Sequence, residues 1–175
     1  MDAKSKSEPV PMNNRTTVER QSGRELVGRR TFNGPARIVF NAWTDPELFK
    51  RWWVPKSFGL TLLSCEMDVR TGGRYCLVFS HPASEQPMAF FGTYSEVIPH
   101  ARIVWTNEEG GENGQTTTVT FEEKDGKTLL VMHELYPSKE ALDDAIASGS
   151  TGAMPEQFDE LDALLVTLGA NAERP

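Results

Sequence analysis

The sequence predicts an α+β domain in which a curved antiparallel sheet is covered by a long C-terminal helix. The first observation is the order of elements, which is one strand, two short helices, six strands and helices at the end. The second is the apolar periodicity, which is two in the strand segments and three to four in the helical ones. The third is the length, because 175 residues allow one domain with a core of its own.

The first predicted elements are a strand over residues 24–32 and two short helices. Pro35 stands at the first position of a helix, where its missing N–H costs nothing. The segment Thr44-Asp45-Pro46 repeats this start signal. Pro55 then ends the second helix, because the residue before a proline avoids the helical conformation.

Six strands are predicted next, over residues 60–69, 74–81, 88–98, 102–107, 115–123 and 128–135. Pairing the first two around the turn at residues 70–73 brings Leu63, Cys65 and Met67 onto one face with Tyr75, Leu77 and Phe79. Such an apolar face cannot be exposed to water, and we place Trp105 and Val131 on it as well.

The C-terminal part is predicted to be helical. Ser138 can cap a first helix that ends before Gly149. Pro155 opens a second, longer helix that carries apolar residues on one face and stops at Gly169. This long helix is the natural cover of the sheet, and a sheet wrapped around one helix leaves a gap that is a candidate cavity.

We expect a flexible tail over residues 1–23, one domain over residues 24–169 and a short tail over residues 170–175. The first segment is polar and cannot bury enough apolar area to offset its ordering entropy. It also lacks the apolar segment of a secretory signal. With two cysteines and no apolar run of about 18 residues, the chain is expected to be cytoplasmic, without a membrane span.

The charge distribution disfavours a general nucleic-acid-binding protein. The net charge is −7 and the isoelectric point is near 5.0, whereas a nucleic-acid footprint is basic. Residues 134–175 hold nine acidic and two basic residues, so the whole excess lies there. We interpret this region as the solvated face of the terminal helices, with an acidic surface for a basic partner as the alternative.

Several segments carry a resemblance to a known family: residues 25–27, 35–47, 52–53, 68–74 and 92–106. They resemble the START-like superfamily, also called SRPBCC or Bet v 1-like. More narrowly, they are similar to the branch named after the C-terminal domain of the activator of the 90-kDa heat-shock protein ATPase. The resemblance covers residues 24–168 and implies a helix-grip fold, with seven antiparallel strands around the last helix and a hydrophobic pocket.

The sequence departs from this family in two respects. The family often begins its last helix with Gly-Trp, whereas this chain has Gly152-Ala153-Met154-Pro155 near the expected cavity mouth. The ligand preference of relatives therefore does not transfer. The eukaryotic chaperone activator also has a separate N-terminal domain that binds the chaperone, whereas 23 residues precede the fold here. This difference argues against a chaperone partner.

The candidate ligand-binding residues are mostly aromatic: Trp52, Trp53, Phe58, Tyr75, Phe91, Trp105 and His133. Trp52 and Trp53 are adjacent, so we expect one to point inward and the other to lie at the rim, with core packing as the alternative for both. Phe91 is expected to point inward. His133 is in phase with Leu129 and Val131, and it lies in the pocket if that face is the concave one; otherwise it is a satisfied structural histidine.

These patterns favour the binding of a small hydrophobic, aromatic or lipid-like molecule, with no cofactor. A cyclase- or aromatase-like enzyme in the same pocket is one alternative, and a polar cluster inside the cavity would favour it. A chaperone-associated module of the stress response is another. The histidines and cysteines show no metal-ligand spacing. A homodimer stays open, because sheet edges invite pairing.

Overall fold

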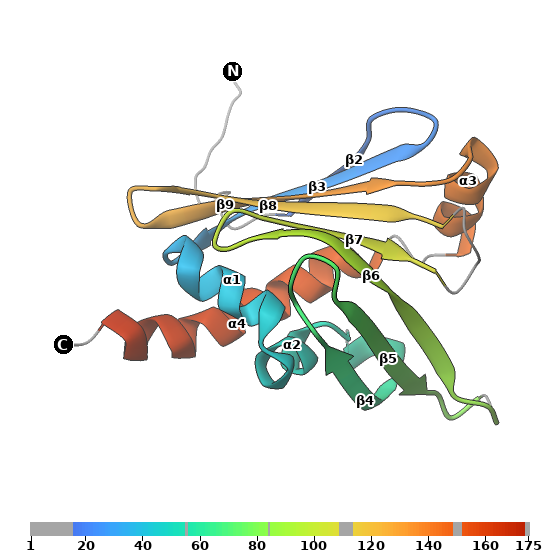
Figure 1. The fold of residues 1–175 in the computed structure, drawn as a ribbon, viewed down its shortest axis with the longest axis horizontal. Coiled ribbons are helices and arrows are strands. Elements are labelled where there is room, and N and C mark those ends of the chain that lie inside the picture. The colour runs from blue at the N-terminus through green and yellow to red at the C-terminus, as the bar shows by residue number, and fades with distance from the viewer. Residues whose placement is uncertain (1–15, 55, 84, 109–113, 149–151, 174–175) are drawn as a thin grey trace, which may run out of the picture.

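The computed structural model describes residues 16–54, 56–83, 85–108, 114–148 and 152–173. Within them, one antiparallel sheet curves around a long C-terminal helix, with two short helices beside that helix and a third at one end of the sheet (Figure 1). The α+β class and the helix-grip arrangement predicted from the sequence are confirmed.

The helical elements are α1 (Ala36–Thr44), α2 (Pro46–Trp52), the 3-10 turn η2 (Lys56–Phe58), α3 (Lys139–Ser148) and α4 (Ala153–Glu173). The strands are β2 (Thr17–Arg20), β3 (Glu25–Asn33), β4 (Thr61–Met67), β5 (Arg74–Ser80), β6 (Met88–Ile98), β7 (Arg102–Asn107), β8 (Thr116–Lys124) and β9 (Lys127–Leu135).

The sheet combines a meander with one long-range pairing. In the described part of the chain its order is β2-β3-β9-β8-β7-β6-β5-β4. From β4 to β9 each strand pairs with the next, and β3 pairs with β9. The helices α1 and α2 carry the chain from β3 to β4 at the far edge, and on that path they pack against α4 (Figure 1).

The structure differs from the predicted boundaries at both ends. The sheet has eight strands within the described residues rather than seven, because Thr17–Arg20 pairs with β3 instead of belonging to a flexible tail. All four residues of β2 are exposed, so no apolar pattern announces this strand. Residues 1–15 lie outside the described part. At the other end, α4 continues to Glu173, because one glycine weakens a helix without ending it.

A β-bulge changes the predicted register of β4. The pairing with β5 shifts between Leu62 and Ser64, so Leu62 lies opposite Phe79. Leu63, which we expected on the apolar face, is instead 54% exposed. A bulge adds one residue to one strand and thereby reverses the side-chain alternation beyond it. Met67 lies opposite Tyr75, as predicted.

Aromatic side chains form the centre of the core between the sheet and the helices. The ring of Trp43 on α1 lies 4.7 Å from that of Trp52, 5.9 Å from that of Trp105 and 6.4 Å from that of Phe158 on α4. Most of these pairs meet edge to face, the arrangement that the ring quadrupoles favour. This cluster joins α1, α2, α4 and β7 into one packed unit.

A buried arginine links α4 to the sheet. Arg30 on β3 is 5% exposed, and its guanidinium lies 2.6 Å from Asp159 and 3.2 Å from Asp162, one turn apart on α4. It also lies over the ring of Phe32 at 5.4 Å. Two of the C-terminal acidic residues therefore neutralise a buried charge, in addition to the solvated role predicted for that region.

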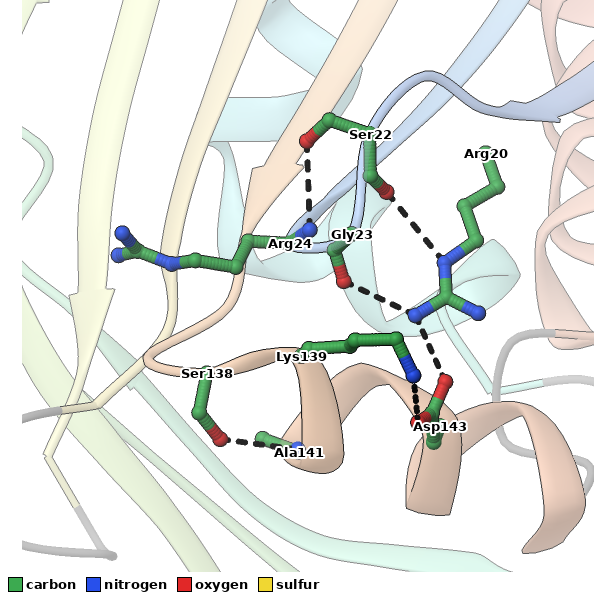
Figure 2. A network of polar contacts seen from close by, with 8 residues as sticks. All are labelled: Arg20, Ser22, Gly23, Arg24, Ser138, Lys139, Ala141 and Asp143. Carbon is green, nitrogen blue, oxygen red and sulfur yellow. Dashed lines mark hydrogen bonds and ion pairs between the residues drawn. The ribbon is translucent and has the colours of Figure 1, made fainter.

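A polar network joins α3 to the turn between β2 and β3 (Figure 2). Arg20 and Lys139 both reach the carboxylate of Asp143, at 2.7 Å and 2.9 Å. Ser138 caps α3, as predicted, by accepting a hydrogen bond from the first helical turn at 3.0 Å. The two cations lower the pKa of Asp143 through hydrogen bonds. The network holds α3 at the end of the sheet where strand β9 ends.

Candidate ligand-binding cavity

A cavity of about 340 Å³ lies between one end of the sheet and the first turns of α4. Its apolar lining consists of Trp53, Val54, Phe58, Leu60, Phe79, Phe90, Trp105, Met132, Ala153 and Met154. Its polar lining consists of Asn107, Gln115, Thr117, Glu134, Tyr136 and Gln157. The volume lies at the lower end of the range for small-molecule sites, which is about 300–1,000 Å³.

Aromatic rings form the wall and the mouth of this cavity. Trp53 is half-buried, and its ring lies 6.2 Å from that of Trp105. Phe58 and Phe90 are 37% and 40% exposed, so the lining reaches the surface. Gln157 on α4 donates a hydrogen bond to the carbonyl of Trp53, which fixes the wall to the helix. Trp53 is the residue that follows the last turn of α2.

The register of the sheet places a polar row beside this aromatic wall. Glu134 on β9 lies opposite Thr117 on β8, which in turn lies opposite Trp105 on β7. Side chains directly opposite each other point to the same face of a sheet. At the strand ends, the next positions of the lining are Gln115 and Tyr136. The cavity therefore has an apolar side and a polar end.

The carboxyl group of Glu134 is the ionisable centre of the polar end. It accepts a hydrogen bond from the hydroxyl of Tyr136 at 3.2 Å and another from Gln115. Burial raises the pKa of Glu134 because the charged form is desolvated, and these two hydrogen bonds oppose that rise in part. Burial, together with the nearby Glu134, also raises the pKa of Tyr136. In the absence of a countercharge, folding therefore shifts this carboxyl group towards its neutral form.

Replacing Glu134 with glutamine should make stability less dependent on pH. The folded chain holds this proton more tightly than the unfolded one, whose pKa is near 4.5. The contribution is fully present below 4.5 and is lost as the pH rises through the folded pKa, by about 1.4 kcal/mol for every tenfold difference between the two acid dissociation constants. Urea unfolding between pH 4.5 and 8 should show Glu134→Gln gaining stability relative to the wild type as the pH rises. A pH-independent difference would contradict this interpretation.

A second, smaller cavity of about 50 Å³ adjoins the first and shares Trp53, Phe90, Trp105 and Asn107 with it. Trp43 lines this space, and its buried indole N–H makes no hydrogen bond within the described part of the protein. Such a volume is large enough for a small polar group. The interior thus offers an acceptor at Glu134 and a donor at Trp43.

The structure separates the predicted aromatic residues into three groups. Trp53, Phe58 and Trp105 line the large cavity. Tyr75 lines the small one, and its hydroxyl donates to the carbonyl of Thr106 at 2.8 Å. Trp52 is fully buried and lines neither cavity, so for this residue the alternative of core packing describes its position.

Val131 does not lie on the covered face where we placed it, and for His133 the alternative of a satisfied structural histidine describes its position. His133 points to the outer face of the sheet with Val131, while Met132 and Glu134 face the cavity. The imidazole of His133 is bonded there to Glu25 at 2.9 Å, and this hydrogen bond lowers the pKa of Glu25. Strand β9 is apolar on both faces near this point, so its periodicity does not tell inside from outside.

The inward phenylalanine on β6 is Phe90 and not Phe91. Phe90 lies opposite Leu77 on the covered face, and its ring is 5.3 Å from that of Phe79. Phe91 lies opposite Cys76 on the other face. Adjacent residues of a strand face opposite ways, so the choice depended on a register that the sequence left open.

Sequence reasoning missed the polar end of the cavity, namely Gln115, Glu134 and Tyr136. The phase of β9 gave no signal for Glu134, because Leu129 and Val131 on one face are as apolar as Leu130 and Met132 on the other. Among the described residues, no group of three or more histidine, cysteine or acidic side chains could hold a metal ion. Within the same residues, no helix is long and apolar enough to cross a membrane.

A curved antiparallel sheet, a long terminal helix and a cavity between them define the class of helix-grip proteins. The family model described as "Activator of Hsp90 ATPase homolog 1-like protein" matches residues 33–166. The chain therefore belongs to this family of AHSA1-like proteins. The match spans every element from the end of β3 into α4.

Solved structures from several bacteria share the fold. A Rhodobacter sphaeroides protein is 24% identical, with a TM-score of 0.78 over 87% of this chain and 99% of that one. A Staphylococcus epidermidis protein is 26% identical, with a TM-score of 0.70 over 86% and 94%. The AHSA1-like protein of Aeromonas hydrophila is 18% identical, with a TM-score of 0.63 over 83% and 94%. No curated protein matches the chain.

Proposed function

We propose that the protein binds a small, mainly apolar molecule with an aromatic or lipid-like body in the cavity between the sheet and α4. The observation that carries the proposal is a cavity of about 340 Å³ whose aromatic lining is exposed at the mouth through Phe58 and Phe90. A cavity of about 150 Å³ accommodates benzene, so this one has room for about two rings. Release of water from the apolar walls would drive binding.

The polar end of the cavity is a polar cluster of the kind that would favour an enzyme, but its composition agrees better with ligand binding than with acid–base catalysis. Proton-transfer enzymes commonly divide the work between two titratable groups in different environments. Within the described lining, Glu134 is the only carboxyl group, and the phenol of Tyr136 is hydrogen-bonded to it. The polar end therefore has the composition of an orienting group for a bound molecule.

A cavity-filling variant tests the proposal. Ala153 lines the cavity at the start of α4, so Ala153→Phe should place a ring inside it. We expect this change to weaken binding of the neutral two-ring probe 2-(1-naphthyl)ethanol at least tenfold, measured by calorimetry. A loss of this size is expected because closing a two-ring site removes several kcal/mol of apolar burial.

Ala163→Phe is the matched control, because Ala163 lies on the same helix and is exposed. This variant should bind the probe as the wild type does. If the wild type does not bind the probe, or if both variants bind it equally well, ligand binding in this cavity is refuted.

A further inference from the structure

The ligand class can be narrowed from the charge inside the cavity, an inference that rests on the proposed function. Glu134 is the only ionisable carboxyl group of the described lining, and no lysine, arginine or histidine lies among those residues. A desolvated carboxylate without a countercharge is unfavourable and favours a ligand that supplies one. An ionised carboxylate offers about four lone-pair sites, of which Tyr136 and Gln115 use two.

The rings beside Glu134 favour the same kind of ligand. Trp105 stands two strands away, and the short side chain of Thr117 lies between them. Neighbouring strands are about 4.8 Å apart, so the backbones at Glu134 and Trp105 are about 10 Å apart, with β8 between them. Trp53 extends this apolar wall towards the mouth. One ligand can thus place a cation near Glu134 and its apolar body along the two indoles.

We propose that the cavity selects an organic amine in its protonated form, with the ammonium group at the carboxylate of Glu134 and an aromatic or apolar body against Trp53 and Trp105. The ammonium group donates to the free lone pairs of the carboxylate, and the pair forms away from bulk water. Hydrogen bonds to charged groups contribute about 1.5–3 kcal/mol, which corresponds to roughly tenfold or more in affinity.

One feature of the cavity favours the opposite charge. Ala153 and Met154 bring the N-terminal turn of α4 to the lining, and this end of a helix attracts anions. The same turn, however, carries the carboxylate of Glu156, which accepts hydrogen bonds from Ser57. This fixed anion offsets the positive end of the helix, so within the described lining the uncompensated charge remains that of Glu134.

Three ligands that share one naphthyl body and differ in charge test the proposal. They are 2-(1-naphthyl)ethylamine, 2-(1-naphthyl)ethanol and 1-naphthylacetate, titrated at pH 7.5 by calorimetry. An alkyl amine has a pKa near that of lysine, about 10.4, and is a cation at this pH. With the wild type we expect the amine to bind at least tenfold more tightly than the alcohol, and the carboxylate to bind most weakly.

The variant Glu134→Gln keeps the shape and the acceptor but removes the charge. It should reduce the preference for the amine over the alcohol to within about threefold, with little change for the alcohol. Glu66→Gln is the matched control, because Glu66 is exposed on β4, and it should keep the wild-type preference.

The outcomes distinguish a failure of the amine specificity from a failure of cavity binding. If the alcohol or the carboxylate binds the wild type as tightly as the amine does, the proposed amine specificity is wrong while cavity binding stands. An amine preference that survives in Glu134→Gln also overturns it, because the charge would then act elsewhere. If none of the three ligands binds, both proposals fail. The wild-type comparison decides the question even if Glu134→Gln does not fold.

Discussion

Replacing Trp52 with alanine is expected to lower the free energy of unfolding by about 3–5 kcal/mol, the usual range for a fully buried tryptophan. Its ring is completely buried and packs against Trp43 at 4.7 Å and Phe49 at 5.4 Å. Its indole N–H donates to the carbonyl of Ala42 at 2.9 Å. The helical partner of that carbonyl would be residue 46, which is a proline without an N–H. Chemical denaturation monitored by circular dichroism measures the loss.

Replacing the neighbouring Trp53 with alanine should affect ligand binding more than stability. Trp53 is half-buried and lines both cavities, so Trp53→Ala should destabilise the fold by less, about 1–3 kcal/mol, and weaken probe binding tenfold or more. Trp52→Phe keeps most of the packing but leaves the carbonyl of Ala42 without its donor, at a cost of about 1–3 kcal/mol. Equal losses of stability at positions 52 and 53 would contradict this division of roles.

The fold could be predicted from the sequence wherever a periodic apolar pattern coincided with a turn or capping signal. Pro35, Pro46 and Ser138 mark helix starts within a residue or two of the observed ones. Strand β2 was missed because its four residues are all exposed, so that backbone pairing with β3 and surface ion pairs such as Glu19–Arg29 hold it in place. Backbone hydrogen bonds do not depend on which side chains are present. An exposed strand of this kind therefore has no apolar alternation by which to predict it.

The cavity was predictable in kind but not in its polar details. Alternation shows which residues of a strand share a face, yet it does not show which face is covered when both are apolar. In β9 the sequence therefore suggested His133 as the cavity residue, whereas Glu134 lines the cavity. In β6 it suggested Phe91, whereas Phe90 lies on the covered face. Arg30 is the converse case, since its phase with Phe32 places a charge on the covered face, where Asp159 and Asp162 neutralise it. The burial of Arg30 could not be predicted from its own strand, because its partners come from a helix about 130 residues further along the chain.

Replacing Gly92 with alanine is the second change with a large expected effect. A Cβ atom built at this position would lie 1.7 Å from the carbonyl oxygen of Thr106 and 2.9 Å from the hydroxyl of Tyr75. The first contact is with backbone, so β6 and β7 must move apart. The hydrogen bond from Tyr75 to Thr106, now 2.8 Å long, would be disturbed as well. Overpacking together with this loss should cost about 2–4 kcal/mol.

Gly23→Ala is the matched control for this prediction. Its Cβ atom would meet only the side chain of Lys139, at 3.6 Å, which is ordinary van der Waals contact. A tolerated surface change of this kind stays within about 0.5 kcal/mol of the wild type. Because Tyr75 lines the small cavity beside Trp105, a shift of β6 from β7 should also weaken binding of the neutral probe. If Gly92→Ala unfolds at the same urea concentration as Gly23→Ala, the close approach of the two strands does not constrain this part of the sheet.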